Sequence, residues 1–275
     1  MGMTIKKFSG DIWSGVDDLD LVLQRDGVVV IESFIQPDVV ERTKDGILQS
    51  LMAVRKDIGS DRLLAAGELG VVRAPMKQSP ELLSLLHDDC LRRLAVALLG
   101  KGAICHLMNG LVLEPFTSNI RHVFQGKFHR DFPRYLNGYR ASINTFLCLD
   151  DFSVANGSTR FIVGSHQSET VPDSSEEIGA QSVEGCAGAL IVFDSTIWHA
   201  AGENTTTGSR VGINIQWTKA FIKQQIDLVR YLGPDYCERL DESVQASLGM
   251  HSRVVTSLEE YYLPSESRLY RAGQG

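Results

Sequence analysis

Apolar residues recur at two different intervals along the chain, and the change falls near residue 100. Before it, the stretches 14–27, 39–59 and 79–100 have helical apolar spacing, and the β-branched run VVVIESFI at 28–35 predicts a buried strand. The third stretch carries the most complete helix signals, because Ser79 can cap it, Pro80 suits its first turn and Gly100 can end it.

After residue 100 the apolar residues gather in short runs separated by turn residues, which is the pattern of strands. The sequence therefore predicts an all-β core, an antiparallel sandwich or barrel, with helices packed on one side, which makes the chain an α+β protein. The predicted strand regions are AICHLMNGLVLEP (103–115), FQGKFHRDF (124–132), YRASINTFLCLDD (139–151), GSTRFIVGS (157–165), GALIVFDSTIWHA (188–200) and SRVGINIQWTKAF (209–221).

One domain is expected to span residues 1–275, because a chain of this length can bury one large core. Residues 1–100 form a mainly helical flank with one strand, about 103–220 form the β core, and 221–275 form a C-terminal helical or irregular cap. The acidic, serine-rich stretch 165–185 is expected to be an exposed loop or lid, since strand-like runs continue on both sides of it.

Charge and hydropathy argue against several classes of protein. The net charge of -7 and the pI near 5.5 argue against nucleic acid or an anionic membrane as a partner, because both attract basic surfaces. The chain has no apolar run of about 18 residues, so no membrane span is expected. It also shows no export signal, and we therefore expect a cytoplasmic location. The five cysteines lack CxxC pairing and are expected to be reduced, mostly buried thiols.

His129 and Asp131 form the first candidate chemical site. In a strand, residues i and i+2 point to the same face, so the imidazole and the carboxylate would project together. An isolated HxD pair is a weak signal, but two histidines and one carboxylate commonly hold a catalytic iron(II). His199, at the end of a predicted strand, is the candidate third ligand. Arg210 opens the next predicted strand, which is expected to pair with that of His199, and its guanidinium can clamp a carboxylate.

Three stretches resemble the phytanoyl-CoA dioxygenase family of iron(II)- and 2-oxoglutarate-dependent oxygenases: FHRDF (128–132), NTFLCLDDFSVANGSTRFIVGSH (144–166) and GALIVFDSTIWHAAGENTTTGSR (188–210). The resemblance covers residues 25–220 and implies a double-stranded β-helix, or jelly roll, of the cupin type. It also implies that an HxD pair and a distal histidine bind the iron, and that an arginine further along binds the far carboxylate of 2-oxoglutarate. Those positions are His129, Asp131, His199 and Arg210.

The resemblance suggests further contacts to 2-oxoglutarate. Phe146 stands where members often place an aromatic residue beside the cosubstrate, and Asn144 would share its strand face. Ala201 replaces a serine that in some members helps to hold the cosubstrate's carboxylate. Thr145 or Asn109 is therefore expected to supply that hydrogen bond.

Basic and aromatic residues near the HxD pair raise the question of the substrate's charge. Arg130, Arg134 and Tyr139 are candidates for substrate binding, and the arginines suit an anionic group such as a carboxylate, a phosphonate or a CoA thioester. Solvated strand edges, or salt bridges to Asp150 and Asp151, explain the arginines equally well. The partner is expected to be a small molecule of open charge, and the protein a monomer or a homodimer.

The reaction implied by the resemblance is hydroxylation of a small molecule by O2, with oxidative decarboxylation of 2-oxoglutarate to succinate and CO2. Asp131 argues against halogenation, because related halogenases have a small residue there that makes room for chloride. Desaturation, epoxidation or epimerisation in secondary metabolism, with the same cofactors, is an open alternative. A non-catalytic, cupin-like protein that binds metal or ligand is another, although such a protein needs no carboxylate clamp at Arg210.

Overall fold

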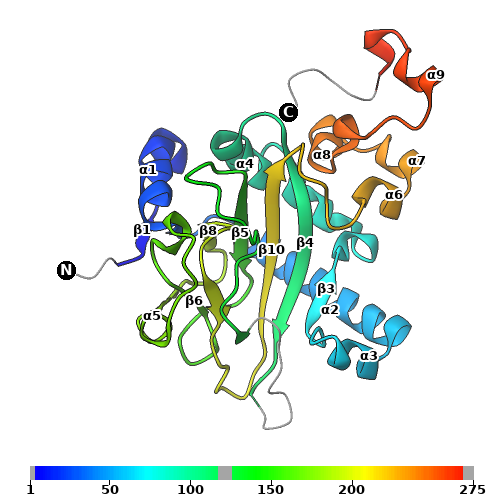
Figure 1. Cartoon of the computed structure of the whole chain (residues 1–275). Coiled ribbons are helices and arrows are strands. Elements are labelled where there is room, and N and C mark those ends of the chain that lie inside the picture. Colours follow the sequence, from blue (N-terminus) through cyan, green and yellow to red (C-terminus); the bar gives the residue numbers. More distant parts are fainter. Residues whose placement is uncertain (1–3, 117–125, 269–275) are drawn as a thin grey trace.

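A computed structural model describes residues 4–116 and 126–268 of the chain, and two β-sheets form its centre (Figure 1). The larger sheet has seven strands in the order β1-β2-β8-β5-β10-β4-β3, and the smaller sheet has three in the order β7-β6-β9. The strands are β1 Lys6–Phe8, β2 Val28–Ile31, β3 Val71–Arg73, β4 Ala103–Leu113, β5 Ser142–Cys148, β6 Thr159–Phe161, β7 Gln181–Ser182, β8 Leu190–Asp194, β9 His199–Ala201 and β10 Arg210–Lys219.

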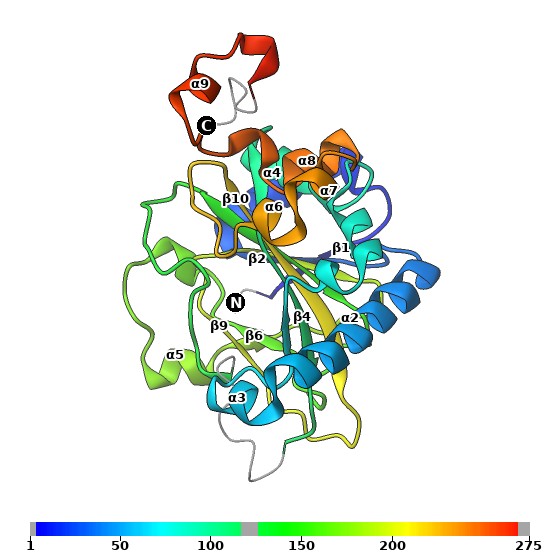
Figure 2. The same ribbon diagram turned by 90° about the vertical axis from the view of Figure 1, so that its right-hand side faces the viewer.

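Helices from both ends of the chain pack against the larger sheet, while α9 lies apart from the body (Figure 2). None of the helices in the described residues combines the length and the hydropathy that crossing a bilayer requires. The α-helices are α1 Val16–Asp26, α2 Pro37–Ile58, α3 Ser60–Ala65, α4 Leu91–Leu99, α5 Ser174–Ile178, α6 Leu228–Leu232, α7 Pro234–Cys237, α8 Glu242–Ser247 and α9 Leu258–Tyr261. The 3-10 helices are η1 Ile12–Gly15, η2 Pro75–Lys77, η3 Pro80–Leu86, η5 Ser165–Gln167, η6 Met250–Ser252 and η7 Ser265–Ser267.

The larger sheet separates two hydrophobic cores, and alternation along its strands assigns each side chain to one of them. On β5, Ile143 and Leu147 belong to the core under the helices, whereas Phe146 and Cys148 belong to the core between the two sheets. Thr145 lies between Ile143 and Leu147 in sequence and shares their face of the strand, toward the helices. Its hydroxyl accepts a 2.9 Å hydrogen bond from the indole of Trp217. The space between the sheets is therefore where β5, β8 and β10 meet β6 and β9.

The predicted architecture is confirmed: a jelly-roll core with flanking helices. α1 ends at Gly27, whose φ of 79° is a left-handed conformation that glycine adopts without strain, and α2 covers most of the predicted stretch 39–59. β2 is shorter than the run 28–35, because the chain turns after Ile31.

The single helix predicted over 79–100 is wrong. The chain forms η3 and α4 there, separated by residues 87–90, and His87 has an extended backbone with a ψ of 155°. Ser79 does not cap η3, because its hydroxyl donates instead to the carbonyl oxygen of Gly46 in α2, at 3.0 Å. Packing against a neighbouring helix outweighs the local capping signal.

Three predictions about strands also need correction. The described part of the region 124–132, residues 126–132, forms no strand and makes one isolated bridge, between His129 and His199; residues 124–125 lie outside the described chain. The run 188–200 forms two strands, β8 and β9, because the chain turns at residues 195–196 and moves from the larger sheet to the smaller one. Consequently β10 pairs with β4 and β5, and not with the strand of His199.

The stretch 165–185 is mostly exposed and holds η5, α5 and β7. α5 begins with a capping box, in which the Asp173 side chain accepts from backbone N–H groups and the Glu176 side chain accepts from that of Asp173. The C-terminal stretch contributes Leu228 and Val244 to the core under the helices. All five cysteines are free thiols, and three of them, Cys105, Cys148 and Cys237, are buried.

Replacing Thr145 by valine tests the assignment of its side chain to the helix side. The change removes the acceptor of the Trp217 indole N–H, and an unsatisfied buried donor lowers the free energy of unfolding by about 1–3 kcal/mol. Urea denaturation followed by circular dichroism measures this loss. The exposed Thr205→Val variant is the control, with an expected change within about 0.5 kcal/mol; an equally small change in Thr145→Val would contradict the assignment.

Candidate metal centre

A backbone bridge brings His129 and His199 together. The N–H of His129 donates to the carbonyl oxygen of His199 at 2.9 Å, and the N–H of His199 donates to that of His129 at 3.0 Å. Two residues that exchange both bonds face each other directly across an antiparallel pair. Their imidazole rings accordingly lie side by side, with centroids 4.4 Å apart.

Both imidazoles present the same nitrogen to the pocket. Nδ1 of His129 lies 2.8 Å from the carbonyl oxygen of Lys127, and Nδ1 of His199 lies 3.1 Å from that of Ile197. A carbonyl oxygen can only accept, so these contacts keep the proton on Nδ1 and leave the Nε2 lone pair for a cation. Phe161 stacks on the His199 ring with centroids 5.7 Å apart, which further fixes its plane.

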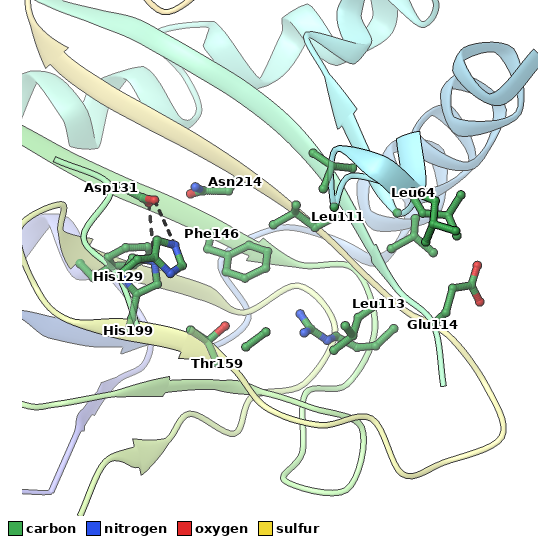
Figure 3. Close-up of a pocket in the computed structure, with 18 residues that line it drawn as sticks. Leu64, Leu111, Leu113, Glu114, His129, Asp131, Phe146, Thr159, His199 and Asn214 are labelled. Carbon is green, nitrogen blue, oxygen red and sulfur yellow. Dashed lines mark ion pairs between the residues drawn. The ribbon is translucent and has the colours of Figure 1, made fainter. Parts of the chain in front are cut away.

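Asp131 completes the group of ligands. Its Oδ1 lies 3.6 Å from Nε2 of His129 and its Oδ2 lies 3.7 Å from Nε2 of His199 (dashed lines in Figure 3). The ligand atoms of the three residues all lie within 4.8 Å of one another, which suits one metal ion. Among the described residues this is the one such cluster, and its two imidazoles and one carboxylate are the ligand set of non-heme iron(II) oxygenases.

The protonation of the three side chains follows from their mutual contacts. Burial lowers the pKa of His199, which favours the neutral imidazole that a metal requires. Burial opposes ionisation of Asp131, but the electrostatic interaction with His199 and the hydrogen bond with His129 outweigh it and lower the pKa of this carboxyl. Burial likewise opposes protonation of His129, yet the hydrogen bond and the charge of Asp131 raise the pKa of this imidazole.

Asn144, on β5, holds the carboxylate from the side of the larger sheet. Its Nδ2 donates to Oδ2 of Asp131 and, at 3.3 Å, to Oδ1 of Asn214. The hydroxyl of Ser195 donates to Oδ1 of Asn144 at 2.5 Å, and the hydroxyl of Ser142 lies 2.7 Å from that of Ser195. These bonds fix the amide of Asn144 in one orientation, with its donor toward the carboxylate. Asn144 is therefore a positioning residue for Asp131.

Arg210 lies in the same pocket at the start of β10. It is only 3% exposed, its Nη2 donates to the carbonyl oxygen of Gly157 at 2.8 Å, and its Nε has no hydrogen-bond partner among the described residues. The guanidinium carbon lies 4.2 Å from the ring centre of Phe152 and 6.0 Å from that of Phe146. Gly157 has a φ of 77°, and a side chain there would collide with Leu113 and with the backbone of Gly202.

No carboxylate of the described residues forms an ion pair with Arg210. Burial lowers the pKa of Arg210 to about 10, although Cys148 and Asp150 partly oppose that effect. A buried and unpaired cation is costly, because the protein replaces little of the lost hydration. Arg210 thus fits the carboxylate of a bound molecule, and with the three ligands it fits 2-oxoglutarate at a metal ion.

The pocket runs from the three ligands past Phe146 to the leucines of β4 and α3 (Figure 3), and Arg210 also lines it. Of the residues proposed for 2-oxoglutarate from the sequence, Arg210 and Phe146 line it. Thr145 points to the helices, so the hydrogen bond expected from it is not available in this pocket. Asn109 does not line it either. The orientation of its amide that suits its neighbours donates to the carbonyl oxygen of Met108 and accepts from Arg73.

The three residues proposed for substrate binding also lie outside this pocket. Arg130 stacks over the ring of Trp198 and donates to the carbonyl oxygens of Ser165 and Ser168, so it fixes the loop around η5. Arg134 is exposed and donates to the carbonyl oxygen of its neighbour, residue 133. Tyr139 lines a separate, polar hollow near α1 and η5. The basic residues around the HxD pair therefore do not converge on the metal centre.

Sequence reasoning missed two residues of the site. Asn214 lines the pocket beside Asp131, and it shares the face of β10 with Arg210, four positions earlier, so the alternation rule could have found it. Ser195 lies in the turn between β8 and β9, and no motif marks it. The turn before β6 also contributes to the site, because the carbonyl oxygen of Gly157 accepts a hydrogen bond from Arg210.

Comparison with known proteins gives concordant results. The chain is 41% identical to the uncharacterized protein Rv1501 of Mycobacterium tuberculosis, over 95% of this chain and 97% of that protein. It is 26% identical to the iron/alpha-ketoglutarate-dependent dioxygenase ausU of Aspergillus calidoustus, over 73% and 69% of the two chains. The structure of EctD from S. alaskensis with 2-oxoglutarate and 5-hydroxyectoine shares the fold, with a TM-score of 0.60, 21% identity and coverage of 73% and 75%.

The model of the family described as phytanoyl-CoA dioxygenase matches residues 23–212, which include His129, Asp131, His199 and Arg210. The match extends over more than half of the chain. This protein belongs to the phytanoyl-CoA dioxygenase family.

Proposed function

We propose that this protein is an iron(II)- and 2-oxoglutarate-dependent dioxygenase that hydroxylates a small molecule. The observation that carries the proposal is the buried Arg210, a cation without a carboxylate partner among the described residues, in the same pocket as two imidazoles and a carboxylate. A protein that only binds metal has no use for this cation, because an unpaired buried charge destabilises the fold.

His129, Asp131 and His199 would hold the iron through Nε2, a carboxylate oxygen and Nε2. With 2-oxoglutarate, bound iron(II) supplies the oxidation, in which O2 gives one oxygen atom to a substrate C–H bond and one to succinate, with release of CO2. The carbonyl oxygens of Lys127 and Ile197 keep both imidazoles in the tautomer that this role requires.

Arg210 would bind the far carboxylate of 2-oxoglutarate, and the chain prepares the guanidinium for that contact. The carbonyl oxygen of Gly157 orients it, and the rings of Phe146 and Phe152 keep water away from it. A charge-assisted hydrogen bond is stronger in such an environment than in water.

A cytoplasmic location and a monomeric or homodimeric state stay predictions of the sequence.

The protein loaded with iron(II) and 2-oxoglutarate without O2 is expected to show a weak visible charge-transfer absorption, and exposure to air is expected to release succinate. Asp131→Ala removes one of three ligands and should abolish both signals. Glu184→Ala, which removes an exposed carboxylate, should change neither. Succinate release by the Asp131→Ala variant at the wild-type rate would contradict the assignment. A wild-type protein that binds iron but gives neither signal would be a binding module.

Arg210→Met should raise the 2-oxoglutarate concentration needed for half-maximal succinate release by about 10- to 100-fold, because a hydrogen bond to a charged group contributes about 1.5–3 kcal/mol. Succinate is measured over a series of 2-oxoglutarate concentrations at saturating iron(II). Arg134→Met is the matched control, since Arg134 is exposed and outside the pocket, and its dependence should equal that of the wild type. Equal curves for the two variants would exclude Arg210 as the cosubstrate clamp.

Asn144→Ala should weaken iron(II) binding by about 10- to 100-fold, because the carboxylate of Asp131 loses the donor that orients it. Anaerobic titration with iron(II) measures this affinity. Thr145→Val is the control on the adjacent residue, which faces the helices, and should bind iron(II) like the wild type. If both variants lose affinity equally, damage to β5 explains the effect, and the positioning role of Asn144 is wrong.

A further inference from the structure

The pocket has an apolar wall on the side where β4 meets β3. Leu64 of α3, Leu69 of the turn before β3, and Leu111 and Leu113 of β4 all line it. Leu64, Leu111 and Leu113 gather at the end away from the three iron ligands, with Phe146 between the two groups (Figure 3). Leu111 and Leu113 share a face because they are two residues apart in one strand.

The turn that carries Leu69 is held tightly against β4. The backbone N–H of Val112 donates to the carbonyl oxygen of Gly70 at 2.8 Å, and a Cβ atom on Gly70 would lie only 2.1 Å from the carbonyl oxygen of Val112, so only glycine fits there. Arg55 of α2 donates to the carbonyl oxygen of Leu69 through Nε at 3.3 Å and Nη2 at 3.2 Å. The wall is therefore a fixed surface.

Few charged groups line this pocket, and each has either a ligand assigned by the proposed function or an ion-pair partner. Arg210 is the one arginine or lysine among the described residues that line it, and 2-oxoglutarate would occupy it. The three iron ligands would be taken by the metal. Glu114 is the remaining charged side chain, and it is negative, with an ion pair to Arg55 at 3.4 Å. An anionic group of a second ligand would find no cation among these residues, and burial of an unpaired charge is unfavourable.

We propose that the substrate presents a neutral, predominantly apolar surface to this wall, and that Leu64, Leu69 and Leu111 select for it. The inference rests on the proposed function, because Arg210 is unavailable to the substrate only when 2-oxoglutarate occupies it. The sequence left the charge of the substrate open, and this inference makes the substrate neutral at the wall. The arginines that suggested an anionic substrate, Arg130 and Arg134, lie outside the pocket.

Two fluorescent probes with the same skeleton test this proposal: neutral N-phenyl-1-naphthylamine and its anionic relative 8-anilinonaphthalene-1-sulfonate. The protein is loaded with redox-inert Ni(II), and calorimetry first establishes whether 2-oxoglutarate binds; failure there counts against the proposed function alone. With 2-oxoglutarate bound, the neutral probe is expected to bind at least tenfold more tightly than the anionic one. Without it, the anionic probe should gain affinity, because its sulfonate can pair with Arg210.

Variants locate the probe on the wall. Leu64→Gln should weaken binding of the neutral probe by about tenfold, which corresponds to about 1.4 kcal/mol. Leu64 is 50% exposed, so this change does not threaten the fold, and Leu111→Gln, on β4 in the same wall, should have the same effect. Leu258→Gln is the matched control, because Leu258 is 72% exposed on α9 and does not line the pocket; it should leave the affinity unchanged.

Two results would overturn the proposal. One is binding of the anionic probe as tight as that of the neutral probe while 2-oxoglutarate is present, since a second cation would then serve the substrate. The other is a neutral probe whose affinity is unchanged in both Leu64→Gln and Leu111→Gln, or reduced equally in Leu258→Gln.

Discussion

The site depends on one backbone contact, the pair of hydrogen bonds that joins His129 to His199. The two residues are far apart in sequence, and His129 belongs to no strand, so this bridge sets the distance between their backbones. Asp131 reaches the same point because the chain continues past the bridge for two residues and the N–H of Phe132 then donates to the carbonyl oxygen of Ser195 at 2.8 Å. Backbone hydrogen bonds therefore hold the chain on both sides of Asp131.

Charge organises the rest of the pocket. The half-buried Asp131 lies beside two imidazoles, Asn144 donates to it, and the contacts together lower the pKa of its carboxyl, so the group stays ionised at neutral pH. At the other side Arg210 stays cationic although burial lowers its pKa. The two opposite charges face ligands that the protein itself does not supply. Uncompensated charges of this kind are expected to lower stability locally. Asn144 and Ser195, which orient the carboxylate of Asp131, are fully buried and so hold it in one position.

Much of this arrangement could be predicted from the sequence, and the failures have physical causes. Most strands of the core follow from apolar alternation, and the family motifs mark His129, Asp131, His199 and Arg210, which the structure places around one pocket. The pairing of the strands does not, because β8 and β9 lie in one continuous apolar run, 188–200, while a turn at Ser195 sends them to different sheets. Arg130 was proposed as a cation near the HxD pair and Thr145 as a substitute for the serine absent at position 201. Neighbouring residues in extended chain point in opposite directions, and both side chains lie outside the pocket. The role of Ser195 follows only from its hydrogen bond to Asn144, which the sequence does not indicate.

The metal centre is tested most directly by a crystal structure of the protein loaded with iron(II) and 2-oxoglutarate without O2, with anomalous diffraction recorded at the iron edge. One anomalous peak is expected, bound by Nε2 of His129, a carboxylate oxygen of Asp131 and Nε2 of His199, with the far carboxylate of 2-oxoglutarate on the guanidinium of Arg210. An iron peak away from these three side chains, or a cosubstrate whose far carboxylate avoids Arg210, would contradict this expectation.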